Sequence, residues 1–132
     1  MTALLRLAKL TGRRDFAAKA EETLRGYGQM MEEHPAASGQ MLVALDFHLG
    51  PVPEFAVVGD PANEDVKRVL RAIRGGYRPN KVVACAAGPV PGVPLLEGKT
   101  PQGAVTIYVC ENYACRAPVV GAEALERALQ TV

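Results

Sequence analysis

The sequence predicts a mixed fold of the α+β or α/β class, in which a helical N-terminal half precedes a small sheet. Apolar residues recur at helical spacing as far as Leu49, whereas short apolar runs rich in β-branched residues begin at Glu54. Most of the 10 prolines and 13 glycines follow Gly50, which marks the same change of character. We therefore expect a helical segment over residues 1–50 and an α/β segment over residues 51–132.

About three helices are expected in the first half, over residues 2–10, 14–33 and 38–49. Gly12 is the stop signal of the first helix, because glycine readily adopts the backbone conformation that ends helices. The second helix ends at His34, since a residue that precedes a proline is disfavoured in the helical conformation.

The second half predicts a βαβ unit. Three short apolar runs, over residues 54–58, 81–87 and 104–110, are expected to form a three-stranded, largely parallel sheet. Asp60 is a candidate N-cap for a helix between the first two strands, and basic residues toward the end of that helix complement its dipole. A strand, a helix and a strand at this spacing form a right-handed parallel crossover. A last helix is expected over residues 122–131.

Composition and charge exclude several classes of protein. The 132 residues fit one domain of ordinary size, and the net charge of +1 argues against a nucleic-acid-binding protein that relies on bulk positive charge. Because no run of about 18 apolar residues occurs, a membrane-spanning helix is not expected. Three cysteines are too few for a disulfide framework, so we predict a reducing, cytoplasmic location. No motif predicts a cofactor.

Cys110 and Cys115 are the candidate redox residues. Cys110 ends a predicted strand and Cys115 lies in the turn that follows, a separation that permits a disulfide. The spacing is C-x₄-C rather than C-x-x-C, so two structural, half-buried thiols are an alternative to a labile or regulatory disulfide. A metal site would need further ligands such as Cys85 or His48, whose spacings match no zinc pattern, and no metal is expected.

Asp46, Asp60 and Lys99 are the candidate ligand-facing residues. Asp60 lies at a strand-to-helix turn, where α/β folds bind ligands, although helix capping explains it as well. Asp46 is a candidate to face a helical cavity, but a single acid makes no catalytic pair for glycoside chemistry. Lys99 lies in a long irregular loop, where solvent exposure is the alternative. A contribution to a carbohydrate-binding site, through Asp46, Asp60 or the loop over residues 88–103, is one alternative for this chain.

Six residue patterns occur in one order along the chain. They are Leu4-Leu5-Arg6-Leu7-Ala8-x-Leu10-Thr11-Gly12, Ala20-Glu21, Val58-Gly59-Asp60, Pro79-Asn80-Lys81-Val82-Val83, Pro94-Leu95-Leu96-Glu97-Gly98-Lys99 and Tyr108-Val109-Cys110-Glu111-Asn112-x-x-Cys115-x-x-Pro118. Together they resemble the C-terminal end of the large thioredoxin-domain-containing proteins of the spermatogenesis-associated protein 20 type. That resemblance implies a parent architecture of a thioredoxin-like domain followed by a six-hairpin (α/α)₆ toroid similar to those of glycosidases. It implies that residues 1–50 are the last hairpins of the toroid and that residues 51–132 close it.

The expected function is therefore that of a non-catalytic C-terminal fragment that closes the toroid of a larger protein. Alone, such a fragment exposes apolar helix faces, so we expect a homo-oligomer, or coverage by the remainder of the parent chain. One alternative is a thiol-redox module that uses Cys110 and Cys115. Another is a contribution to carbohydrate binding, with a sugar as ligand. Neither a nucleic acid nor a membrane is an expected partner, and no enzymatic activity is expected of the fragment alone.

Overall fold

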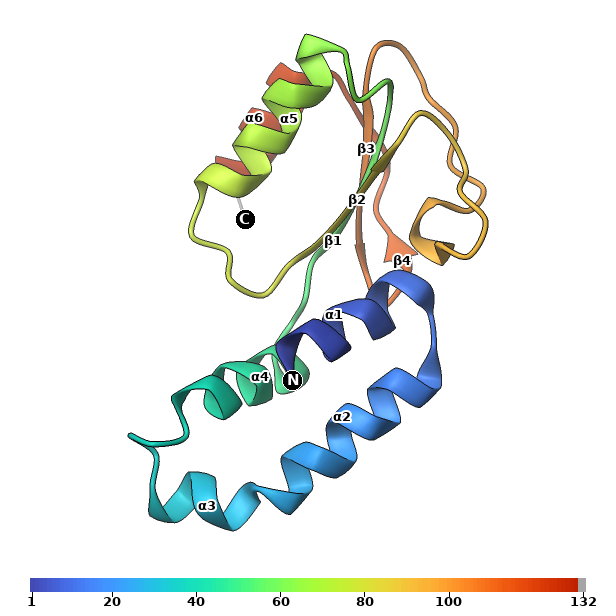
Figure 1. Cartoon of the computed structure of the whole chain (residues 1–132). Coiled ribbons are helices and arrows are strands. Elements are labelled where there is room, and N and C mark those ends of the chain that lie inside the picture. The colour runs from blue at the N-terminus through green and yellow to red at the C-terminus, as the bar shows by residue number, and fades with distance from the viewer. Residues whose placement is uncertain (131–132) are drawn as a thin grey trace.

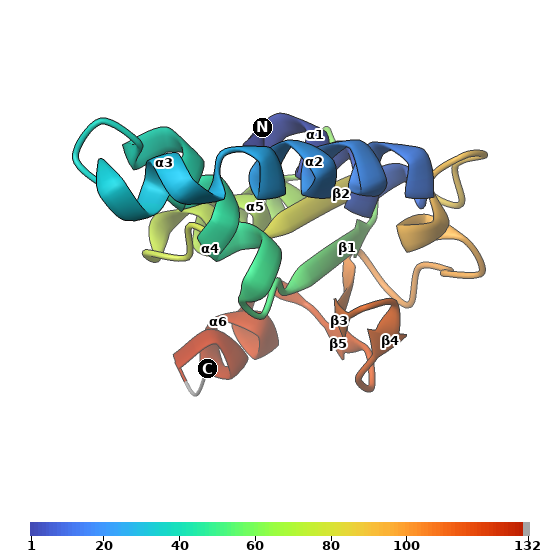
Figure 2. The same cartoon turned by 90° about the horizontal axis from the view of Figure 1, so that it is seen from below.

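The computed structural model describes residues 1–130 and arranges them in three layers (Figures 1 and 2). A helical layer contains α1 (Thr2–Thr11), α2 (Arg14–Gly26), α3 (Gly28–Glu33) and α4 (Gly39–Leu49). The middle layer is a sheet of β1 (Glu54–Val58), β2 (Val82–Ala86), β3 (Thr106–Glu111), β4 (Ala114–Cys115) and β5 (Val119–Val120). The third layer holds α5 (Glu64–Gly75) and α6 (Ala122–Gln130), and a 3₁₀ turn, Pro94–Leu96, lies in the loop before β3. The mixed α/β class, with its helical N-terminal half, is confirmed.

The helical half contains four helices where about three were expected. The long helix predicted over residues 14–33 is interrupted at Tyr27, which has φ −101° and ψ 9° and separates α2 from α3. Gly26 and Gly28 flank this break, and glycine is the least favourable ordinary residue in a helix apart from proline. Gly12 ends α1 with a left-handed backbone, φ 66°, as its position predicts.

The sheet is mixed rather than largely parallel, and it has five strands rather than three. The strand order of the sheet is β2-β1-β3-β4, and β5 also pairs with β3. β1 and β2 pair in parallel, as the predicted βαβ unit requires. β3 runs antiparallel to β1. It follows a long irregular loop without a crossover helix, so the handedness rule for parallel connections does not constrain it. β4 and β5 have two residues each, too few to produce an apolar period.

Helix α5 begins later than the sequence predicts. Its N-cap is Asn63, whose side chain accepts a hydrogen bond from the Asp65 N–H at 2.8 Å. The prediction that Asp60 caps this helix was wrong: Asp60 Oδ1 accepts from the Ala62 N–H at 2.9 Å and closes a turn that precedes the helix. Asp60 and Asn63 are both residue types that favour the N-cap position, and Asn63, which is nearer the helix, occupies it. Of the helix predicted over 122–131, residue 131 lies outside the described residues.

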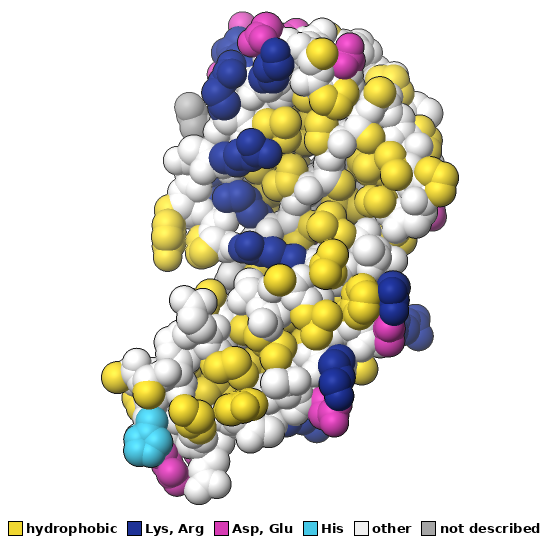
Figure 3. Space-filling model, in the orientation of Figure 1, with side chains coloured by type: hydrophobic (Ala, Val, Ile, Leu, Met, Phe, Trp, Pro, Cys, Tyr) yellow, Lys and Arg dark blue, Asp and Glu magenta, His cyan; other side chains and the backbone are white. Residues whose placement is uncertain are grey.

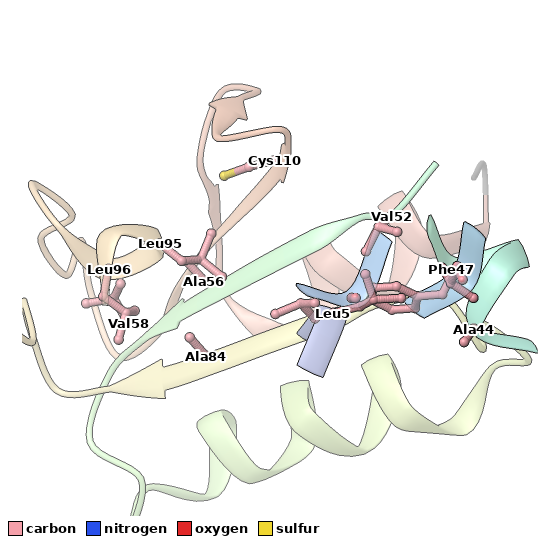
Figure 4. Close-up of a cluster of buried hydrophobic side chains, with 13 residues drawn as sticks. Leu5, Ala44, Phe47, Val52, Ala56, Val58, Ala84, Leu95, Leu96 and Cys110 are labelled. Carbon is pink, nitrogen blue, oxygen red and sulfur yellow. The ribbon is translucent and has the colours of Figure 1, made fainter. Parts of the chain in front are cut away.

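Two apolar clusters fill the spaces between the layers, and β1 contributes to both because successive side chains of a strand point to opposite faces. Phe55 and Val57 face α5 and α6. Ala56 and Val58 face the other side, where they join Leu5 of α1 and ten further buried residues (Figure 4). The helical half and the sheet therefore share one core cluster.

No helix within residues 1–130 combines the length and the apolar character needed to cross a membrane.

Candidate functional site: the β3–β4 hairpin

A tight hairpin at the end of the sheet brings the two candidate redox cysteines together. Its two connecting residues, Asn112 and Tyr113, both have positive φ, 50° and 63°. Two successive left-handed residues match the right-handed twist of the flanking strands and make the two-residue turn favoured in hairpins. For a residue other than glycine this backbone costs about 1–2 kcal/mol. Other contacts must hold the turn.

The first such contact is a disulfide. Cys110 of β3 and Cys115 of β4 are direct register partners, and their sulfur atoms are bonded, with Cα atoms 3.9 Å apart. The two ends of the bond differ in environment, because Cys110 is 2% exposed and belongs to the core whereas Cys115 is exposed. Cys85, the third cysteine, is free and half-buried.

A buried carboxylate is the second contact, and it was missed at the level of sequence. Glu54, the first residue of β1, is fully buried and is the register partner of Cys110, so both side chains lie on the same face of the sheet. Its Oε2 accepts a hydrogen bond from the Tyr113 N–H at 2.9 Å. Its Oε1 lies 3.3 Å from Lys9 Nζ of α1 in an ion pair. That contact lacks hydrogen-bond geometry, so Oε1 accepts no hydrogen bond from any described residue.

The turn also forms hydrogen bonds with the C-terminal end of α1. Lys9 Nζ donates a hydrogen bond to Asn112 Oδ1 at 2.8 Å, and Tyr113 Oη donates to the Lys9 carbonyl at 2.6 Å. Burial, and then the charge of Glu54, raise the pKa of the Tyr113 phenol, which keeps it protonated as a donor. We call Lys9, Glu54, Asn112 and Tyr113 the clamp. The clamp joins α1, β1 and the hairpin turn.

A hollow of about 540 Å³ opens beside the disulfide. Its walls include Phe55 of β1, Cys110 of β3 and Leu125 of α6. Arg116, which follows β4, lies at the same hollow, and its main-chain N–H donates to the Val109 carbonyl at 3.0 Å. The hollow is mainly apolar and lies on the α6 side of the sheet, with Cys110 among its lining residues.

The three candidate ligand-facing residues lie in different segments of the chain. Asp46 accepts a hydrogen bond from Asn80, in the loop that leads into β2. Asp60 lies just beyond the C-terminal end of β1, whereas Asn80 precedes β2 and lies near the N-terminal end of β1. The five residues of β1 span about 17 Å. Lys99 lies with its Nζ 5.6 Å from the centre of the Tyr108 ring. Each of the three residues has its own contact with another described residue.

Within residues 1–130, no three His, Cys, Asp or Glu side chains converge in a way that suits a metal ion.

Comparison with known proteins places the chain among relatives that are much longer. No family model matches it, and neither does any solved structure. It is 31% identical to spermatogenesis-associated protein 20 of Rattus norvegicus and 30% identical to that of Homo sapiens, in each case over 88% of this chain and 16% of the relative. It is 27% identical to an uncharacterised protein of Caenorhabditis elegans over 93% of this chain and 17% of the relative. The chain thus spans about one sixth of the length of these relatives. The resemblance that the residue patterns predict is confirmed, and over most of its length this chain is related to the spermatogenesis-associated protein 20 family.

Proposed function

We propose that this chain is a non-catalytic packing module that closes the helical toroid of a larger protein. The supporting comparison is that its relatives are about six times longer, so most of each relative has no counterpart in this chain. The chemistry of its described residues supports the same proposal, because its candidate acids are separated and engaged in local contacts. A module of this kind needs an apolar face that remains open in the isolated chain.

The helical layer offers such a face, and this observation carries the proposal. Four large apolar side chains of this layer are exposed. Tyr27, which joins α2 to α3, is 48% exposed and Met30 of α3 is 43% exposed, while Val43 and Leu49 of α4 are 49% and 74% exposed. A hollow of about 460 Å³ lies among α2, α3 and α4, with Leu24, Met31 and Leu42 in its walls. Figure 3 shows hydrophobic side chains gathered over the part of the surface that the helical layer forms. Leu42 and Leu49 of α4, seven positions apart and therefore on one side of the helix, both line this hollow and suit packing against a further helix of the parent protein.

The isolated chain should cover the same face by self-association. Sedimentation velocity over a dilution series is the measurement, and we expect the wild-type chain to associate at micromolar concentration. Val43→Glu combined with Leu49→Glu should give a monomer, because two carboxylates would then be buried in the contact. Tyr77→Glu is the matched control, since Tyr77 is 95% exposed but lies outside the helical layer. A wild-type chain that stays monomeric at every concentration contradicts the proposal.

A second function, thiol–disulfide exchange, is favoured by the unequal exposure of the two bonded cysteines. A thiolate of an external dithiol attacks the Sγ of the exposed residue Cys115, the Cys110–Cys115 bond breaks, and the sulfur of Cys110 leaves and takes up a proton. The second thiol of the external dithiol then attacks the mixed disulfide, which releases Cys115. The external dithiol is oxidised to a disulfide, and the cysteine pair takes up two electrons and two protons.

Intact mass spectrometry of protein purified without reductant tests this second function. We expect a gain of about 2 Da on reduction, together with a reduction potential that a glutathione buffer can reach. A bond that persists in millimolar glutathione at pH 7 would leave the disulfide with a structural role only. Cys85→Ser is the control variant, because it removes the free thiol and with it the alternative pairings.

A further inference from the structure

A cluster of four cationic side chains lies at the opposite edge of the sheet from the hairpin. Arg6 comes from α1, Arg74 from the end of α5, and Arg78 and Lys81 from the loop that leads into β2. Within residues 1–130, β2 pairs only with β1, so it is an edge strand. We call these four residues the basic cluster. In Figure 3 a column of Lys and Arg side chains descends this face, and the lower part of the column has no acidic side chain beside it.

Main-chain carbonyls hold three of the four side chains in place. Arg6 Nη2 donates to the Pro79 carbonyl and Lys81 Nζ donates to the Arg78 carbonyl, each at 3.0 Å. Arg78 Nη2 donates to the Leu129 carbonyl of α6 at 2.9 Å. Each of these bonds uses one N–H donor and no formal negative charge. The cationic groups are therefore positioned, but their charge is not neutralised and most of their donors stay available.

The basic cluster has no acidic partner among the described residues. Six other basic residues each pair with a carboxylate: Lys9, Arg13, Lys19, Arg25, Lys67 and Arg68. The chain has 14 acidic residues against 15 basic ones, so the lack of a partner does not reflect a shortage of acids. Burial, followed by the charges of Arg78, Arg6 and Arg74, lowers the pKa of Lys81. These like charges repel one another, and a bound anion would relieve the repulsion.

A hollow of about 430 Å³ separates the cationic groups, with Arg6, Arg78 and Lys81 in its walls. Its remaining walls are mainly apolar: Leu10, Pro79, Val82 and Val83. This volume falls within the range of pockets that bind small molecules. The hollow therefore combines donors for an anionic group with apolar surface for an organic one.

We propose that the basic cluster binds a phosphate group carried by a small molecule. Guanidinium groups present paired N–H donors that match the oxygen atoms of phosphate, and Lys81 adds a point charge. A single carboxylate needs only one guanidinium as partner, whereas several cations suit the double negative charge of a phosphate monoester. Neither the basic cluster nor its hollow includes the disulfide or the exposed apolar side chains of the helical layer, so the proposal goes beyond the proposed function without depending on it.

Nuclear magnetic resonance titration of the full chain tests the proposal. Glycerol phosphate and inorganic phosphate are added separately in chloride buffer at constant ionic strength, and succinate serves as the carboxylate comparison. We expect saturable shifts confined to the amides of residues 5–10 and 74–83, with glycerol phosphate at least as effective as inorganic phosphate. Lys81→Gln and Arg6→Gln should each weaken binding by roughly tenfold, because each removes one charged side chain from the walls of the hollow. Arg14→Gln is the matched control, since it makes the same charge change on α2.

Three results would overturn the proposal. One is the absence of saturation by either phosphate, and another is an equal response to succinate at equal ionic strength. The third is much tighter binding of a single-stranded oligonucleotide than of glycerol phosphate, which would identify a nucleic-acid surface in place of a small-molecule site. Thermal unfolding of each variant confirms that it is folded. Arg78→Gln is left out of the primary set, because it also removes the contact with α6.

Discussion

The buried carboxylate of Glu54 allows a quantitative test of how the hairpin is held against α1. Glu54→Gln keeps the shape of the side chain and an oxygen that can accept from the Tyr113 N–H, but it removes the charge that attracts Lys9. The Lys9 side chain is 27% exposed, so it can turn toward water and keep its bond to Asn112. The expected loss is that of one charge-assisted contact, about 1–3 kcal/mol in the free energy of unfolding.

Glu54→Leu should cost more, for a reason that the same contacts supply. Leucine leaves the Tyr113 N–H without its acceptor and Lys9 without its counter-charge. The unsatisfied N–H adds about 1–3 kcal/mol to the loss expected of Glu54→Gln. Lys9→Met leaves the buried Glu54 carboxylate without its counter-charge. Because Glu54→Gln removes that charge, the double variant should lose less stability than the sum of the losses in the two single variants.

Urea unfolding followed by circular dichroism, with the disulfide intact, measures these free energies. Glu97→Gln is the control, because Glu97 is an exposed acid whose side chain has no ion pair among residues 1–130, and it should change stability by less than about 0.5 kcal/mol. The reasoning is refuted if Glu54→Leu is no more damaging than Glu54→Gln. It is also refuted if the single-variant losses of Lys9→Met and Glu54→Gln simply add, since the ion pair would then contribute nothing.

Three further predictions follow from other contacts. Gly59→Ala places a Cβ atom 2.8 Å from a main-chain oxygen and 2.8 Å from a valine side chain, and should cost about 1–3 kcal/mol of stability in urea. The matched change Gly28→Ala meets nothing within 4 Å and should stabilise by about 0.5–1 kcal/mol; similar effects of the two changes would argue against the packing around Gly59. Reduction of the Cys110–Cys115 bond, which closes a loop with a sequence separation of 5, should lower stability by about 2 kcal/mol, and an unchanged urea midpoint after reduction would contradict this. Burial raises the pKa of the Cys85 thiol, so its alkylation rate should rise at higher pH than in urea-unfolded protein, where the pKa is about 8.5; coincident pH profiles would show that the thiol is not shielded.

The βαβ unit could be predicted because its signals are local. The apolar run over residues 54–58 coincides with β1, and the run over 81–87 contains β2 with one additional residue at each end. Between them, acidic residues near the start of α5 and basic residues near its end complement the helix dipole. Parallel pairing then follows from the crossover.

The rest of the sheet could not be predicted in the same way. The direction in which β3 pairs depends on how the long loop before it crosses the molecule, and irregular residues carry no periodic signal. The interruption at Tyr27 was likewise hidden, because the apolar stripe continues across it and only the neighbouring glycines weaken the helix.

The candidate site shows a similar division. Cys110 and Cys115 could be found because cysteine is rare and their separation is short. Glu54 gave no signal, since its hydrogen-bond donor Tyr113 is 59 positions away and an acid at the start of a strand resembles a polar boundary. The basic cluster was hidden by the net charge of +1, which averages over the whole chain the charges that the fold gathers at one edge of the sheet.

The two proposed functions of this chain are physically connected through α1. Leu5 of α1 packs in the core cluster that also contains Ala56 of β1, so the helical layer and the sheet share buried surface. At the rim of that cluster, the clamp fixes the last turns of α1 to a turn whose backbone is costly without its contacts. The disulfide restricts that turn, so its reduction should loosen α1 before it loosens the strands. We therefore expect that reduction of Cys110 and Cys115 alters how firmly the helical layer presents its apolar face, so the two proposals are compatible rather than rival.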